Sequence, residues 1–219
     1  MINPFKKKKS EIDKNHFRVT IFGSARIKKN DARYEQVKSL AKMLGESGID
    51  IVTGGGPGLM QAASVGHNAG MKNSKKDSHS IGLLIKLPNE QKTATFLNIK
   101  KEFERFSNRL DKFMELSNVF VVAPGGIGTT LELFYTLQLI QVKQTCNVPV
   151  ILIGKMWKPL IQWLKDYPVK NQLMNIADLD SIFLAENNGE AMKIINKAHQ
   201  HFNKGDKNLC LNLKKYKLK

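Results

Sequence analysis

One glycine-rich segment has the composition and position to bind a phosphate group. Residues 124–130 read Pro-Gly-Gly-Ile-Gly-Thr-Thr and follow directly on the apolar run 119–123. A strand that ends at glycines and continues as a helix gathers unpaired backbone N–H groups and the positive end of the helix dipole, which favours an anion. A tight turn without a ligand is the alternative. A second glycine cluster, 54–58, also ends an expected strand, and two such turns favour binding.

Glu132 and Arg109 are the side chains that could act on a compound held there. Glu132 follows Thr129 by three residues, so its carboxylate can face the rim of the expected sheet. The same spacing also fits a capping box, which would only stabilise the helix, by about 1 kcal/mol, and spacing alone favours the cap. Composition does not distinguish Arg109 from Arg105, because both could belong to a solvated basic face. The apolar stripe of their helix is expected at Phe103, Phe106, Leu110 and Phe113.

Strands and helices alternate along the chain and predict an α/β fold. The order implies βαβ crossovers and a Rossmann-like, mainly parallel sheet with helices on both faces, in a single domain. Both glycine turns then lie at carboxyl ends of strands, where such folds bind ligands. Strands are expected at 17–22, 49–53, 81–85, 119–123, 148–153 and 181–184, with a short one near 97–99. Helices are expected at 34–47, 60–69, 103–113, from the glycine turn at 124–130 to about 143, 157–164 and 191–202.

The charge is the unusual part of the composition. The chain has 35 Lys+Arg against 19 Asp+Glu, a net charge of +16, which favours anionic partners. Lysine-rich ends predict basic tails at 1–16 and 205–219 around a domain at 17–204. No nucleic-acid-binding motif accompanies the charge, so nucleic acid is not the favoured partner. No stretch approaches the roughly 18 apolar residues that span a bilayer, so we expect a cytoplasmic protein without a membrane partner.

The remaining patterns argue against metals and common cofactors. Cys146 and Cys210 are distant and belong to no Cys/His cluster, so neither a disulfide framework nor a metal site is predicted. The expected first strand ends in Gly-Ser-Ala-Arg at 23–26 rather than in the dinucleotide motif, and 154–156 lacks the rest of a Walker motif. No cofactor is expected. His67 and His79 have no partner that the sequence indicates.

Three motifs together resemble the LOG family of cytokinin riboside 5′-monophosphate phosphoribohydrolases, whose members often carry the older label of lysine decarboxylase. The motifs are Gly-Gly-Gly-Pro-Gly-Leu-Met at 54–60, Arg109 with Ser117 eight residues later, and Pro-Gly-Gly-Ile-Gly-Thr-x-x-Glu at 124–132. The similarity extends over about 17–164 in order and spacing, and the last motif is its most specific part.

The resemblance implies a Rossmann-like homodimer that hydrolyses the N-glycosidic bond of a purine nucleoside 5′-monophosphate. The products would be adenine, or an N6-modified adenine, and ribose 5-phosphate, with no cofactor. By motif position the catalytic pair is Arg109 and Glu132, which favours Glu132 as a catalyst over Glu132 as a cap. The substrate contacts implied in the same way are Ser24, Gly55, Gly56, Glu90, Gly125, Gly126, Ile127, Gly128, Thr129 and Thr130.

Three positions depart from the family pattern and leave other functions open. Leu110 stands where the family usually has lysine, and Asn118 and Leu131 stand where it has acidic residues, which puts substrate choice and turnover in question. One alternative is a non-catalytic carrier of a nucleotide or a molybdenum cofactor on the same fold. The other is a nucleic-acid-binding Rossmann-like protein, similar to the DNA-processing protein family.

Overall fold

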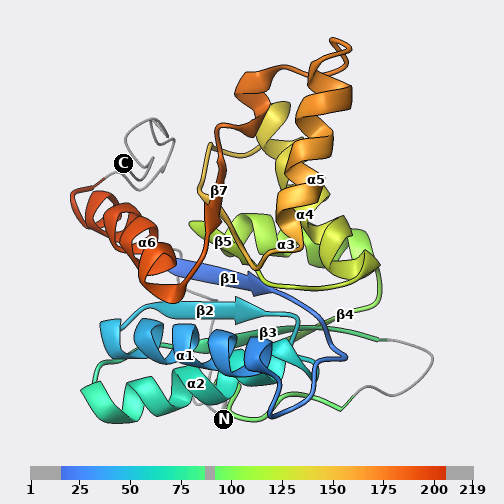
Figure 1. Cartoon of the computed structure of the whole chain (residues 1–219). Helices are drawn as coiled ribbons and strands as arrows, with labels where there is room; N and C mark the ends of the chain where they lie inside the picture. The colour runs from blue at the N-terminus through green and yellow to red at the C-terminus, as the bar shows by residue number, and fades with distance from the viewer. Residues whose placement is uncertain (1–15, 87–91, 206–219) are drawn as a thin grey trace, which may run out of the picture.

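A computed structural model describes residues 16–86 and 92–205, and a seven-stranded parallel sheet forms its centre (Figure 1). The spatial order of the strands is β4-β3-β2-β1-β5-β6-β7, and every neighbouring pair is parallel. Strands with uninterrupted apolar runs lie centrally, because both faces of a parallel sheet are covered. The strands are β1 (Arg18–Phe22), β2 (Asp50–Thr53), β3 (Ser80–Ile85), β4 (Ile99–Phe103), β5 (Val119–Val122), β6 (Val150–Ile153) and β7 (Ile182–Ala185).

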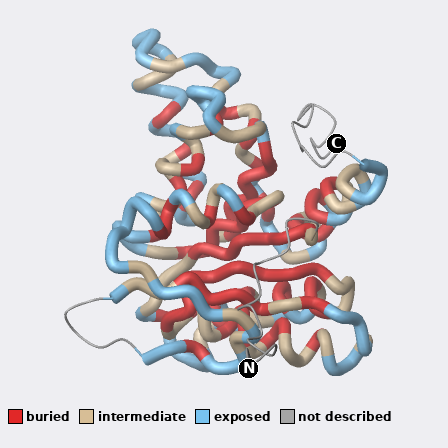
Figure 2. Tube along the Cα trace, turned by 180° about the vertical axis from the view of Figure 1, so that it is seen from behind, coloured by how far each residue is buried: buried red, intermediate tan, exposed pale blue. Residues whose placement is uncertain are grey.

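Within the described part of the chain, six α-helices cover the two faces of the sheet, three on each. Helices α1, α2 and α6 pack on one face around Leu40, Leu59 and Ile195, while α3, α4 and α5 pack on the other around Phe113, Leu133 and Trp157. The buried centre and exposed outer helix surfaces are seen in Figure 2. The helices are α1 (Ala32–Ser47), α2 (Leu59–Ser74), α3 (Phe106–Leu116), α4 (Ile127–Gln141), α5 (Trp157–Leu164) and α6 (Asn188–Asn203).

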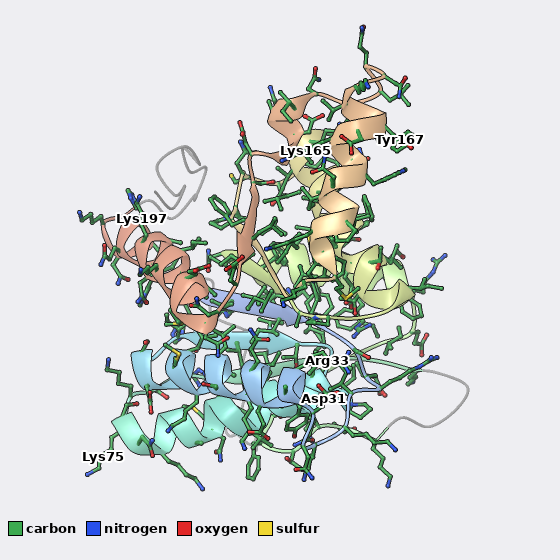
Figure 3. The ribbon with its side chains drawn as sticks, viewed as in Figure 1. Asp31, Arg33, Lys75, Lys165, Tyr167 and Lys197 are labelled. Atoms are coloured by element: carbon green, nitrogen blue, oxygen red, sulfur yellow. The ribbon has the colours of Figure 1, made fainter. Side chains whose placement is uncertain are left out.

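Local sequence explains where the first helix begins and ends. Asp31 is the N-cap of α1, and its side chain accepts a hydrogen bond from the backbone N–H of Arg33 at 2.9 Å. Gly48 closes the helix in the left-handed conformation, with φ of 73°, which glycine adopts without strain. Figure 3 shows Asp31 and Arg33 at this helix start, and basic side chains such as Lys75 and Lys165 projecting from the helices.

The α/β fold class is confirmed, and the differences from the expected elements are local. Helix α2 continues to Ser74, beyond the expected end at 69. Phe103 belongs to β4 rather than to the helix, because its backbone pairs with Ile85 at the sheet edge and α3 starts only at Phe106. The predicted tails fall almost wholly on 1–15 and 206–219, which lie outside the described residues.

Two further expectations concern cysteines and membranes. Cys146, in the loop after α4, is disulfide-bonded. The sequence predicts no disulfide framework, and Cys210, the other cysteine of the chain, lies outside the described residues. Within residues 16–86 and 92–205, no helix combines the length and the hydrophobicity needed to cross a lipid bilayer.

Candidate functional site

A pocket of about 470 Å³ opens at the carboxyl ends of β1 and β5. The chain continues from β1 toward one side of the sheet and from β5 toward the other, so this is the point at which strand order reverses. Open parallel sheets bind ligands at this crevice, and the volume lies within the usual range for small-molecule sites. The lining residues are Ile21, Phe22, Gly23, Ser24, Ala25, Arg26, Gly54, Met60, Ile85, Phe106, Arg109, Gly126, Ile127, Gly128, Thr129 and Glu132.

The amino end of α4 forms one wall of the pocket and presents unpaired amide groups. Gly126 is its N-cap and supplies no side-chain cap, so the first-turn N–H groups are available to a ligand. A Cβ at Gly126 or Gly128 would meet nothing within 4 Å. Packing within the described protein therefore does not demand glycine at these two positions, and the missing Cβ atoms leave the backbone open to close approach by an anion.

Glu132 faces this pocket instead of capping the helix. Because α4 begins at Ile127, Thr129 lies inside the first turn, and no side-chain cap bond is formed. The capping-box interpretation, which spacing alone favoured, is therefore wrong. The Glu132 side chain is 15% exposed. Burial raises its pKa from 4.5 to about 7, with Arg109 acting in the opposite direction, so the carboxyl can exchange a proton near neutral pH.

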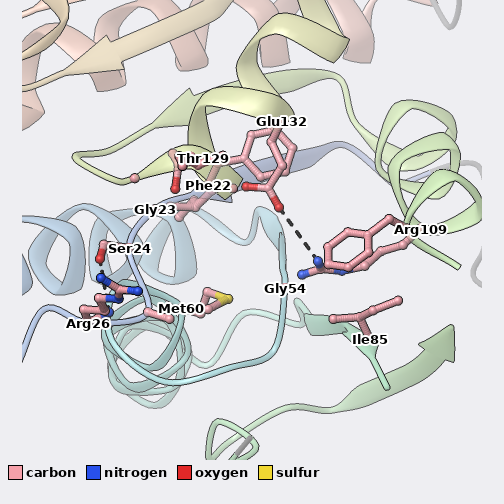
Figure 4. A pocket seen from close by; sticks show the side chains of 16 residues that line it. Phe22, Gly23, Ser24, Arg26, Gly54, Met60, Ile85, Arg109, Thr129 and Glu132 are labelled. Carbon is pink, nitrogen blue, oxygen red and sulfur yellow. Dashed lines mark hydrogen bonds and ion pairs between the residues drawn. The ribbon is translucent and has the colours of Figure 1, made fainter. Parts of the chain in front are cut away.

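Arg109 is buried beside Glu132 and held in place by the sheet. Its Nε donates to the carbonyl of Leu83 at 2.7 Å, and its guanidinium lies 5.3 Å from the ring centroid of Phe113. Its Nη1 is 4.0 Å from Oε1 of Glu132, as the dashed line in Figure 4 marks. Burial lowers the pKa of Arg109 and Glu132 raises it. The solvated-face interpretation is therefore wrong for Arg109, although Arg105, the N-cap residue of α3, is exposed.

The glycine cluster at 54–58 makes room for this arginine. A Cβ at Gly54 would overlap Nη2 of Arg109 and would approach the sulfur of Met60 to 2.7 Å. Gly58 has φ of 68°, and a Cβ there would overlap the carbonyl of Ser24. These glycines therefore position Arg109 and bring the start of α2 against the loop after β1, where the N–H of Leu59 donates to Ser24 at 2.9 Å.

The predicted site residues divide into those that line the pocket and those that do not. Thr130 directs its hydroxyl to the carbonyl of Gly126 at 3.1 Å, within the helix. The Gly55 carbonyl accepts from the N–H of Ala94 at 2.7 Å. Glu90 lies outside the described residues. The pocket brings together Arg109, Glu132, Ser24, Gly126, Ile127, Gly128 and Thr129; Gly55, Gly56, Gly125 and Thr130 lie outside its lining.

Sequence reasoning missed several side chains of the lining, four of which change its charge or its apolar surface. Arg26 adds an exposed cation beside Ser24, and Met60, Ile85 and Phe106 add apolar surface. Figure 4 shows Ser24 and Arg26 toward one side of the pocket and Arg109 toward the other. Because the charges of Arg109 and Glu132 offset one another when both are ionised, Arg26 gives the lining a net positive charge. Its place in the Gly-Ser-Ala-Arg sequence directly after β1 was the available signal.

The three departures from the family pattern lie outside the pocket lining. Leu110 is 6% exposed and packs within α3, and Leu131 is 47% exposed on α4. Asn118 bridges to the start of β1, accepting from the N–H of Arg18 at 2.8 Å. None of these three side chains lines the pocket. Within the described residues, any effect on substrate choice would therefore have to pass through other side chains.

Comparison with known proteins decides the family. The model of the family described as "Possible lysine decarboxylase" matches residues 60–195. The chain belongs to this family. The label is the older name that LOG-type proteins carry, so the resemblance drawn from the motifs is confirmed at family level.

One curated relative is named after an enzymatic activity. It is the pyrimidine/purine nucleotide 5′-monophosphate nucleosidase of Escherichia coli strain K12, 30% identical over 135 residues. A protein of the same name from Escherichia coli O157:H7 matches equally. The match covers 57% of this chain and 28% of the relative, so the chain spans less than a third of the curated relatives' length.

Solved structures share the fold at low sequence identity. The molybdenum cofactor binding protein of Rippkaea orientalis aligns with a TM-score of 0.59 and 18% identity, covering 83% of this chain and 96% of that one. The molybdenum cofactor carrier protein of Chlamydomonas reinhardtii aligns with a TM-score of 0.58 and 19% identity, covering 84% and 99%. DNA processing protein A of Helicobacter pylori gives 0.52 and 16%, covering 84% and 81%. At these identities the likeness shows the common Rossmann-like fold alone.

Proposed function

We propose that this protein hydrolyses the N-glycosidic bond of a nucleoside 5′-monophosphate, releasing the free base and ribose 5-phosphate. One observation carries the proposal. A buried carboxylate with a pKa of about 7, Glu132, lies 4.0 Å from the buried cation Arg109 in a pocket that also contains an uncapped helix start. The pocket thus offers an anion site and an ionisable carboxylate at one point.

The layout of the lining suggests how a nucleotide would lie. The 5′-phosphate would accept hydrogen bonds from the first amides of α4, with Ser24 and Arg26 on the same side. The ribose would then lie under Glu132. The base would extend toward Arg109, against the apolar surface of Ile85 and Phe106. Phe106 is 49% exposed, and an aromatic ring open to the pocket can stack on a base.

The reaction needs only a water molecule besides the substrate. As the C1′–N bond breaks, its electron pair leaves with the base and positive charge develops on the ribose ring. The ionised carboxylate of Glu132 stabilises that charge and accepts a proton from the attacking water, whose oxygen bonds to C1′. Arg109 stays protonated and stabilises the electron pair on the departing base. The base takes up a proton from solvent and Glu132 releases to solvent the proton that it accepted, so the net reaction consumes one water molecule.

The family relationship and the named relatives support this chemistry. A relative 30% identical over 135 residues is named a nucleotide 5′-monophosphate nucleosidase, although it is a much longer protein. That name includes pyrimidine and purine bases, whereas the LOG resemblance favours adenine or N6-modified adenine. We propose a purine nucleotide, with Arg109 and Glu132 as the catalytic pair.

We also propose that the protein acts as a cytoplasmic homodimer associated through α4. Ile127 and Leu131 lie one turn apart on α4, Val142 directly follows the helix, and the three side chains are 90%, 47% and 49% exposed. A stripe of exposed apolar residues is typical of an interface. Light scattering of a size-exclusion peak would test the dimer, and a monomer at micromolar concentration would contradict it.

Product analysis on four compounds tests the function. Purified protein is incubated with adenosine 5′-monophosphate, its N6-isopentenyl counterpart, a pyrimidine 5′-monophosphate and adenosine, and free base and ribose 5-phosphate are quantified. We expect equal amounts of base and ribose 5-phosphate from a purine monophosphate and much slower cleavage of adenosine. Gly126→Val, which fills space beside the α4 amides, should abolish turnover, whereas Gly189→Ala at the start of α6, outside the pocket lining, should not.

The same assay separates the alternatives. Nucleotide that binds and is recovered intact would favour a non-catalytic carrier. No nucleotide binding, together with DNA or RNA binding that weakens steeply with salt, would favour a nucleic-acid-binding protein.

A further inference from the structure

A second cluster of ionisable side chains lies at the opposite edge of the sheet from the pocket. Asp50 is the first residue of β2, His79 directly precedes β3, and His16 lies two residues before β1. These strands are neighbours in the sheet, and all three are parallel. Their starting ends therefore bring together one carboxylate and two imidazoles that are far apart in sequence.

Each histidine approaches a different oxygen of the Asp50 carboxylate, at a distance close to that between neighbouring ligands of one metal ion. Nδ1 of His16 is 3.3 Å from Oδ2 of Asp50, and Nδ1 of His79 is 3.5 Å from Oδ1. The three ligand atoms all lie within 4.8 Å of one another. A charge-assisted N–H···O⁻ hydrogen bond is shorter, about 2.7–2.9 Å. Bonds of about 2.0–2.1 Å to tetrahedral zinc place neighbouring ligand atoms about 3.3–3.4 Å apart.

We propose that His16, Asp50 and His79 bind one divalent transition-metal ion of the zinc class. Two imidazoles and one carboxylate are ligands that Zn²⁺ accepts, and water would complete a tetrahedral set. Neither the family match nor the named relatives assign a metal here. The proposal is independent of the proposed nucleotide hydrolysis, because the cluster and the pocket lie at opposite ends of the strands.

The surroundings of Asp50 hold its carboxylate in position. The side chain is 3% exposed, and its Oδ1 accepts the backbone N–H of His79 at 2.8 Å. Arg18 places its Nε 3.4 Å from Oδ2. Such outer partners orient a metal-binding carboxylate. The positive charge of Arg18 also weakens cation binding at this carboxylate, so the two imidazoles must supply much of the affinity.

The cluster is open to solvent on the side of its two histidines. Their side chains are 41% and 33% exposed, while Asp50 is buried between them. An ion can therefore reach the carboxylate from solvent, past two rings whose centroids are 5.8 Å apart. A bound ion would tie the segment before β1 to the starts of β2 and β3, so its effect would be on stability.

Zinc titration of the intact, untagged chain tests the site. After treatment with a chelator and its removal, Zn²⁺ is titrated by calorimetry and the thermal midpoint is followed with and without Zn²⁺. We expect one ion per chain and a higher midpoint. His16→Asn and His79→Asn should each weaken binding about tenfold or more, and the double variant should abolish the thermal shift. The matched control His201→Asn removes an imidazole from α6 and should leave binding unchanged.

Two results would overturn the proposal. One is the absence of stoichiometric Zn²⁺ binding by the native chain, which would mean that the histidines serve only as partners of Asp50. The other is binding that persists unchanged in the double variant. If the variants fold poorly, Co²⁺ in the native chain keeps the test decisive, because its visible absorption distinguishes a tetrahedral protein site from hydrated ion.

Discussion

The two edges of the sheet contain the same chemical pair, a buried carboxylate and a buried arginine, in different surroundings. At the amino edge, Asp50 lies 3.4 Å from Arg18, accepts the backbone N–H of His79 and faces two imidazoles. At the carboxyl edge, Glu132 is 4.0 Å from Arg109, its one charged partner among the described residues, and faces a pocket.

The surroundings of the two carboxylates suit Asp50 to a structural role and Glu132 to a chemical one. Asp50 is held by several partners, so its charge is compensated and it fixes the starts of three strands. Glu132 is buried with less compensation, and burial raises its pKa to about 7. A carboxyl in that state is costly for folding but suited to proton transfer at neutral pH. Changes at the two edges should therefore have opposite signatures.

Asp50→Asn should give the largest effect, on stability alone. Removing the carboxylate breaks the buried ion pair with Arg18 and replaces the charged acceptor of the His79 N–H by a neutral one, which costs about 3–5 kcal/mol. Urea denaturation measures the free energy of unfolding, and nucleotide turnover is normalised to folded protein. Turnover per folded molecule should stay within twofold of the native value. Lost turnover with native stability would show that the two edges are not functionally separate.

Glu132→Gln should have a stability effect that depends on pH. Because the folded pKa of about 7 lies above the ordinary 4.5, the folded protein binds a proton between these values that the unfolded chain has released. The native protein therefore loses stability as pH rises from 4.5 to 7, and the variant lacks this loss.

The comparison of the two proteins by denaturation at pH 5 and pH 8 checks this sign. Relative to that of the native protein, the free energy of unfolding of the variant should increase by up to about 3 kcal/mol from pH 5 to pH 8. A difference that is constant with pH would contradict a raised pKa at Glu132.

Gly54→Ala should reduce kcat/KM about 100-fold, because the added methyl displaces the Arg109 guanidinium and small misplacements of a catalytic group cost about that much. The arginine itself remains, so the change tests its position rather than its presence. Steady-state kinetics is the measurement, and circular dichroism confirms folding. Native kcat/KM in this variant would mean that the placement of Arg109 does not matter.

Arg26→Ala should have the smallest effect, an increase of about tenfold in KM for the monophosphate. The loss of one charge-assisted contact at an exposed site is worth about 1.4 kcal/mol. Cleavage of the corresponding nucleoside should not change, since it has no phosphate. The neighbouring exposed residue provides the control Lys29→Ala. An equal loss on both substrates would place Arg26 away from the phosphate.

Local patterns in the sequence were sufficient to predict most strands and helices and the two glycine turns, although Phe103 was expected in a helix and belongs to β4. Glu132 was ambiguous, because the distinction between a cap and a pocket side chain depends on whether the helix begins at Ile127 or at Thr129. The burial of Arg109 could not be predicted, since its position depends on Gly54 and Leu83 from other strands. The cluster at the amino edge was missed for the same reason: His16, Asp50 and His79 meet only when β1, β2 and β3 pair.

A single-turnover assay of Glu132→Gln tests the central claim most directly. Excess protein, native or variant, is mixed with the purine monophosphate, and bound nucleotide and free base are measured over time, with the exposed Glu102→Gln as control. We predict that Glu132→Gln binds the nucleotide with native affinity and releases base at least about 1,000-fold more slowly, while the control is unchanged. Base release at the native rate by Glu132→Gln would contradict the assignment of this carboxylate as the catalyst.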